Sequence, residues 1–160
     1  MRLALALILS LLMGVPCARA ADLGGIWKFD QAAWAAQSDK LLAAMLAAIP
    51  AKDMADMKAA GIDPEKAYRE GLSEPIDGTV EFLPDGKLRA QASGETTMEE
   101  GTWKLDGDQL HVEYPNGETR DALEGSVAGD RIVLKPVVTD ESAAEAQVLA
   151  AVVVTLVRQR

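Results

Sequence analysis

Residues 77–137 alternate short apolar-rich segments with tight turns, and this rhythm constrains the fold more than any other feature of the chain. The turn signals are Pro84-Asp85-Gly86, Ser93-Gly94, Asp106-Gly107-Asp108, Pro115-Asn116-Gly117 and Ala128-Gly129-Asp130. Such short turns join antiparallel neighbours. Strands repeated about every ten residues are typical of a β-sandwich or a β-barrel.

Six strands are predicted in this region, and one strand on either side of it makes eight. Side chains alternate along several of them, as where Leu110 and Val112 alternate with His111 and Glu113. The predicted strands are residues 24–30, 77–83, 87–92, 96–105, 109–114, 118–127, 131–137 and 148–158. Consecutive hairpins favour an up-and-down order, and closure removes exposed edges. We therefore predict a mainly β chain that forms an eight-stranded antiparallel up-and-down barrel.

A helical insertion is predicted after the first strand, over about residues 31–71. Residues 31–60 contain twelve alanines and no glycine, a composition that favours helix. Asp30 is a suitable N-cap, Pro50 interrupts the first helix, and Gly71 ends the last. The insertion packs across one barrel mouth or along one side. Residues 139–147 form a polar connector with room for one helical turn.

The first twenty residues have the features of a secretory signal peptide. A basic start precedes an apolar run, which is too short to span a bilayer, and Ala18-Arg19-Ala20 matches a cleavage signal. We expect cleavage after Ala20, a periplasmic or secreted protein, and one domain over residues 21–160. Cleavage also removes Cys17, the only cysteine, which leaves no thiolate for catalysis or for a metal.

The charge of the chain argues against two classes of partner. The formal net charge is -9, and removal of Arg2 and Arg19 leaves 14 basic against 25 acidic residues. An acidic protein repels phosphate backbones, so nucleic acid is not an expected partner. After signal cleavage, no remaining segment is long and apolar enough to span a membrane.

Two segments resemble the lipocalin-like barrels, a calycin-type group that includes many small exported bacterial proteins. Residues 23–30 are similar to the G-x-W first strand of that group, and residues 101–110 are similar to its G-T-W-x-L-x-G-D-x-L hairpin. Arg158 stands where lipocalins carry an arginine that packs on the first-strand tryptophan, Trp27. The resemblance implies structural roles for Trp27, Trp103 and Arg158, with a cation–π contact between Trp27 and Arg158.

The resemblance also implies a binding barrel, often for apolar small molecules. We expect non-catalytic binding of a small apolar or amphipathic molecule in the cell envelope, without a cofactor or metal. The candidate ligand contacts are Val80, Phe82, Leu88 and Met98 on the strands and Trp34, Met45, Met54 and Met57 on helices that close the cavity. Two alternatives stay open: the helices only support the barrel, or the barrel is filled by its own side chains.

A second function fits the same resemblance, because some bacterial periplasmic protease inhibitors share this type of barrel. The alternative is thus a protein-binding module, such as a periplasmic enzyme inhibitor or an envelope-assembly factor. Enzyme activity is not expected. His111 is the only histidine and shares a strand face with Glu113, but no nucleophile or further ligand has recognisable spacing. We predict a solvent-facing histidine.

Overall fold

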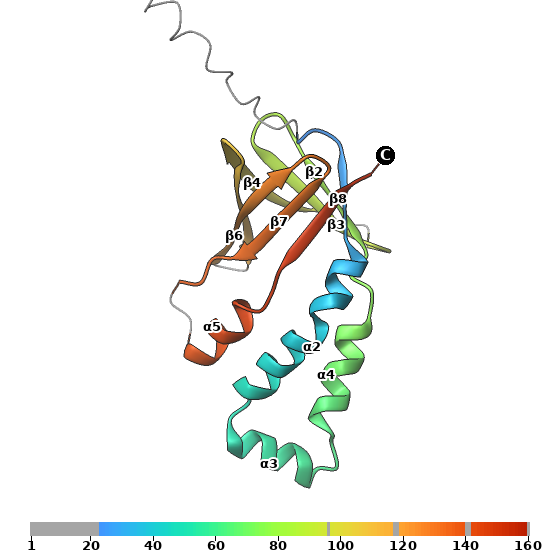
Figure 1. Cartoon of the computed structure of the whole chain (residues 1–160), viewed down its shortest axis with the longest axis vertical. Coiled ribbons are helices and arrows are strands. Elements are labelled where there is room, and N and C mark those ends of the chain that lie inside the picture. The colour runs from blue at the N-terminus through green and yellow to red at the C-terminus, as the bar shows by residue number, and fades with distance from the viewer. Residues whose placement is uncertain (1–22, 96, 117–118, 140–141, 160) are drawn as a thin grey trace, which may run out of the picture.

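The computed structural model describes residues 23–95, 97–116, 119–139 and 142–159; the predicted signal peptide and its cleavage site lie outside these ranges. Within them, eight antiparallel strands close into a barrel in sequence order, as predicted (Figure 1). The strands are β1 (Ile26–Phe29), β2 (Gly78–Phe82), β3 (Lys87–Ala92), β4 (Glu99–Asp106), β5 (Gln109–Asn116), β6 (Thr119–Ala128), β7 (Arg131–Pro136) and β8 (Val154–Arg158). The helices are α2 (Gln31–Ala48), α3 (Ala51–Ala59), α4 (Pro64–Ser73) and α5 (Ala143–Leu149).

The prediction of a strand over residues 148–158 is wrong in its first half. The strand begins only at Val154, and α5 and a turn precede it. The side chain of Ser142 accepts from the Glu145 backbone N–H, while the Glu145 carboxylate accepts from the Ser142 backbone N–H. This reciprocal capping box starts α5 within the predicted polar connector, and the helix continues into the first two residues of the predicted strand.

One end of the barrel is filled by aromatic side chains. Trp27 is fully buried, and the ring of Phe82 meets it edge-on at a centroid distance of 6.3 Å. Phe82 meets Trp103 in the same way at 5.8 Å. The indole N–H groups also have partners, because Trp27 donates to the Leu23 carbonyl and Trp103 to the Leu83 carbonyl. Both tryptophans therefore contribute packing and hydrogen bonds at this end.

Arg158 covers the same end from outside. Its guanidinium lies 4.6 Å from the centre of the Trp27 ring, so the contact implied by the resemblance is present. Trp27 and Arg158 are register partners across β1 and β8. The guanidinium also donates to the Gly24 carbonyl, and its Nε lies 3.5 Å from Oδ1 of Asp130. We call Trp27, Arg158 and their contacts the closed end.

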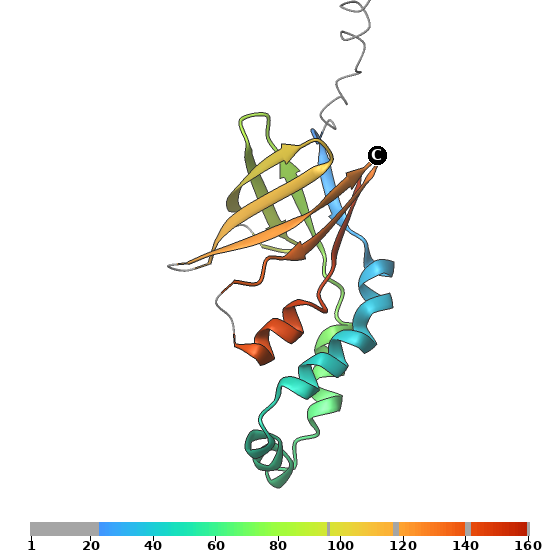
Figure 2. The same cartoon turned by 60° about the vertical axis from the view of Figure 1, so that its left-hand side comes forward.

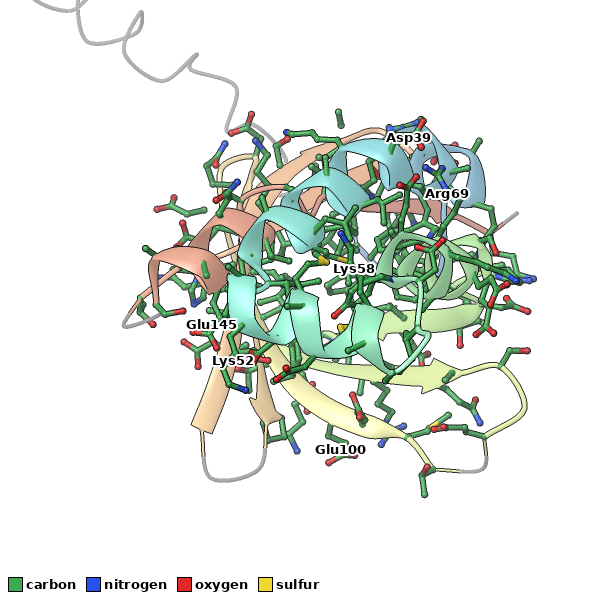
Figure 3. All side chains as sticks on the ribbon, turned by 90° about the horizontal axis from the view of Figure 1, so that it is seen from below. Asp39, Lys52, Lys58, Arg69, Glu100 and Glu145 are labelled. Carbon is green, nitrogen blue, oxygen red and sulfur yellow. The ribbon has the colours of Figure 1, made fainter. Side chains whose placement is uncertain are left out.

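The helices α2, α3 and α4 form a helical arm that extends from the other end of the barrel. Both views show α2 and α4 side by side, with α3 at the tip farthest from the strands (Figures 1 and 2). Leu41 and Ala44 of α2 pack with Ala151 in a second, smaller core. Asp39 and Arg69 point toward one another across α2 and α4 at 2.9 Å (Figure 3). Contrary to one expectation, α3 does not cross the barrel mouth; an 18-residue α2, about 27 Å long, carries it away.

Two polar side chains fix the helical arm to the barrel. Oδ1 of Asp30 accepts from the Ala33 N–H and caps α2, while Oδ2 lies 3.2 Å from Arg131 on β7. The Gln37 amide makes two hydrogen bonds with the backbone of Val153, just before β8. These contacts fix the direction in which α2 extends from the barrel. Among the described residues, no helix combines the length and apolar character needed to cross a bilayer.

Replacement of Arg158 by methionine tests the closed end. The variant retains an unbranched side chain but loses the cation–π contact and the bond to Gly24. We expect the free energy of unfolding in urea to fall by about 1–3 kcal/mol, with partial recovery in Arg158→Lys. Arg89→Met is the control, because its exposed pair with Glu100 is worth no more than about 1 kcal/mol. Equal losses in the two methionine variants would contradict this role of Arg158.

Gly125→Ala tests how closely β6 and β7 approach. A Cβ at Gly125 would lie 1.8 Å from the carbonyl oxygen of Val133, so the backbone must move. We expect the free energy of unfolding in urea to fall by at least about 1–3 kcal/mol. Gly71→Ala is the control, because a Cβ on this α4 residue meets nothing within 4 Å. It should stabilise the protein by about 0.5–1 kcal/mol. An unchanged free energy of unfolding in Gly125→Ala would contradict the close approach of β6 and β7.

Candidate ligand site

The half of the barrel away from the closed end contains an inner cavity of about 240 Å³. Its walls are mostly aliphatic and aromatic. The lining residues are Phe29, Val80, Phe82, Leu88, Ala90, Glu99, Val112, Tyr114, Leu123, Leu134, Val154 and Leu156. Of the four strand residues predicted to contact a ligand, Val80, Phe82 and Leu88 line this cavity. The barrel interior is therefore filled at one end and open at the other.

Met98, the fourth predicted strand contact, lies outside the cavity, and its neighbour Glu99 takes the place on the wall. Met98 is 53% exposed and precedes β4, which begins at Glu99 rather than at residue 96. Trp103 of β4 pairs with Val112, and strand side chains alternate between faces, so Glu99 and Gly101 share the inner face. Met98 was predicted to line the cavity because it is hydrophobic. The strand register instead puts the Glu99 carboxylate on the inner face.

Glu99 and Tyr114 line the inner cavity and Asp121 pairs with Tyr114, and we call these three polar residues the mouth. They belong to the adjacent strands β4, β5 and β6. Tyr114 pairs with Asp121, and Tyr114 follows the buried Leu110 and Val112 on the same face of β5. A Cβ at Gly101 would lie 3.2 Å from Cβ of Tyr114, so the glycine leaves room for the tyrosine at this point.

The phenol at the mouth is held in its protonated form. Burial raises the pKa of Tyr114, and the negative charges of Asp121 and Glu99 raise it further. A neutral phenol both donates and accepts one hydrogen bond, and its ring presents a negative face. The mouth therefore combines one hydroxyl group with two carboxylates at the end of an apolar cavity.

An outer groove of about 520 Å³ adjoins the mouth between the barrel rim and α5. Tyr114 and Leu123 line both the groove and the inner cavity, so the two spaces meet at these residues. The remaining lining residues are Ala48, Asp121, Ala122, Pro136, Val137, Thr139, Ala144, Glu145, Val148 and Leu149. Sequence reasoning missed this groove because it predicted at most one helical turn in residues 139–147 and a strand from residue 148, where α5 lies. The Ser142–Glu145 capping box was the available signal for the full helix.

The predicted helical contacts are placed elsewhere. Trp34 donates from its indole to the Leu72 carbonyl and lines a groove of about 420 Å³ between α2 and α4. Met45 packs in the small core around Leu41. Met54 and Met57 are half-buried on α3, at the tip of the helical arm (Figure 1). None of the four lines the inner cavity. Of the alternatives for these helices, support fits their packing better than closure of the mouth.

His111 lies on the outer barrel face between two carboxylates. Its Nε2 is 3.1 Å from Oε1 of Glu113, and its Nδ1 is 3.1 Å from Oε1 of Glu124 on β6. The hydrogen bond to Glu113 raises the pKa of the imidazole, partial burial opposes this, and the bond to Glu124 raises it again. Within the described part of the chain, no group of three or more His, Cys, Asp or Glu side chains is suited to hold a metal ion.

No family model, curated protein or solved structure matches this chain. Arguments about function therefore depend on its own residues and their geometry.

The His111 cluster predicts a pH-dependent contribution to stability. The folded-state pKa is raised above the unfolded value of about 6.5, so the contribution is complete below that pH and is lost as pH rises through the folded pKa. Urea unfolding should show that His111→Gln costs at most about 1 kcal/mol near pH 5.5 and nothing near pH 9. Because the sequence has one histidine, NMR titration reports this ring alone. Glu113→Gln should lower its pKa, and an unchanged value would contradict the role of the pair.

Proposed function

We propose that the chain is a lipocalin-like binding protein that holds a small apolar or amphipathic molecule inside its barrel without catalysis. The observation that carries this proposal is the inner cavity of about 240 Å³, walled by apolar side chains and open at one end. Ligand sites in proteins are concave and mostly apolar, with a few placed polar groups. The mouth supplies such groups in Glu99, Tyr114 and Asp121.

The size of the cavity limits the ligand. A dry apolar cavity of about 150 Å³ admits benzene, so about 240 Å³ accommodates an apolar group of about ten carbon atoms. A larger molecule extends into the outer groove, which begins at Tyr114 and Leu123. The inner cavity suits one chain or ring, and the groove suits the more polar remainder.

Two features support the lipocalin-like assignment. The barrel has eight strands in up-and-down order, and Arg158 lies over the first-strand tryptophan, Trp27. The insertion differs from the usual lipocalin plan, which has a long loop after the first strand. For the cellular location, the proposal rests on the signal-peptide features of residues 1–20, and we place the protein in the bacterial periplasm or outside the cell.

Ala90→Phe tests whether the inner cavity binds ligand. Ala90 lines the cavity and pairs with both Val80 and Glu99, so a phenyl ring there fills space that the ligand requires. We expect the protein to bind 1-octanol in isothermal titration calorimetry and Ala90→Phe to bind it at least about tenfold more weakly.

Ala128→Phe is the matched control. Ala128 is exposed at the end of β6, where it pairs with Arg131 beside the turn to β7. This variant should keep the affinity of the original protein. Failure of the unaltered protein to bind 1-octanol, or equal binding by Ala90→Phe, would contradict a ligand site inside the barrel.

A further inference from the structure

One carboxylate lines the inner cavity and two line the outer groove, and the two spaces meet at Tyr114 and Leu123. Glu99 comes from β4, Asp121 from β6 and Glu145 from α5, three elements that the fold brings together. Among the described residues, neither space is lined by a lysine or an arginine. The charged side chains among the described lining residues of the two spaces are therefore all acidic.

Strand register places two of these carboxylates on the inner face of the barrel. Glu99 lies on the inner face with Gly101, and Asp121 lies on the inner face opposite Tyr114. The neighbouring Glu100 points away from the barrel interior (Figure 3). Its carboxylate lies 3.5 Å from Nε of Arg89. Glu99 is exposed and Asp121 is partly buried, so both carboxylates lie close to solvent at the end of an apolar wall.

Glu145 is fixed by its own helix. Its carboxylate accepts hydrogen bonds from the Ser142 hydroxyl and backbone N–H, and these bonds lower its pKa. It therefore stays ionised at neutral pH and contributes a fixed negative charge to the groove wall. Tyr114 stays neutral, so its ring presents a π-face and its hydroxyl accepts a hydrogen bond.

We propose that the ligand is a cationic amphiphile, with an apolar group of about ten carbons or fewer in the inner cavity and an ammonium-type head between Glu99 and Asp121. This inference rests on the proposed function and specifies the chemistry of its ligand. An anionic head would meet two inward carboxylates at the mouth and Glu145 beyond it. A neutral head would gain only a hydrogen bond from this surface, whereas a cation gains charge-assisted hydrogen bonds as well.

Three probes with the same eight-carbon chain test the charge of the head. Calorimetric titration at low ionic strength compares octylammonium, 1-octanol and octanoate on the whole protein. We expect octylammonium to bind at least about tenfold more tightly than 1-octanol, and octanoate more weakly than either. Added salt should reduce the preference for octylammonium, because it screens charges near the surface.

The double variant Glu99→Gln with Asp121→Asn locates the effect. It should bind octylammonium and 1-octanol with similar affinity, because the charges that favour the ammonium head are gone. Glu100→Gln is the matched control, since it makes the same change one residue away on the outer face. It should keep the preference for octylammonium. Urea unfolding of each variant checks that the barrel is intact.

The outcomes separate this inference from the proposed function. Equal affinity for octylammonium and 1-octanol in the unaltered protein would overturn the cationic ligand and leave apolar binding in place. A preference for octylammonium that survives the double variant would overturn the assignment to Glu99 and Asp121. Failure of all three probes to bind would overturn both the inference and the proposed function.

Discussion

The pairing of β1 with β8 closes the barrel, and the rest of the structure depends on it. Both strands are short, and their register joins Trp27 to Arg158. The indole is buried beneath the guanidinium, which also binds the Gly24 carbonyl and lies near Asp130. Without this closure, β1 and β8 would both present unpaired edges. The closed end also makes the two halves of the barrel different. Its aromatic side chains fill one half, and the cavity lies in the other.

The helical arm is held by polar contacts near the start of α2 and by the packing of Leu41 and Ala44 on Ala151. Asp30 caps α2 and contacts Arg131 on β7, and Gln37 pairs with the backbone beside β8. These contacts direct α2 away from the strands, so the methionines of α3 are far from the cavity. The place near the mouth is taken instead by α5, which is seven residues long and starts at the Ser142 capping box. The helix that contributes most to the groove is thus a minor feature of the sequence, whereas the longer α2 contributes only Ala48.

Sequence periodicity was reliable wherever a turn set the register of a hairpin. Asp106-Gly107-Asp108 and Ala128-Gly129-Asp130 placed the adjoining strand ends to within one residue. The prediction of Met98 followed hydrophobicity instead, whereas alternation from Trp103 puts Glu99 on the inner face. Periodicity failed at residues 148–153, where apolar valines fit a strand but local capping and packing on α2 produced a helix and a turn. Hydrophobicity alone therefore selected the wrong side chain for the cavity wall and did not identify Glu99.

The sequence by itself determined the number and order of the strands and the helical insertion, and its resemblance to lipocalin-like barrels indicated the tryptophan and arginine that meet at the closed end. The strands and the insertion follow from local turn chemistry, alternation and capping, each of which acts within a few residues. Only the tertiary structure decided that the open half of the barrel is hollow, that Glu99 and Asp121 face inward beside Tyr114, and that α5 rather than α3 borders the mouth. Those outcomes depend on how eight strands close and how much volume their side chains fill, which are properties of the assembled barrel and not of any one segment.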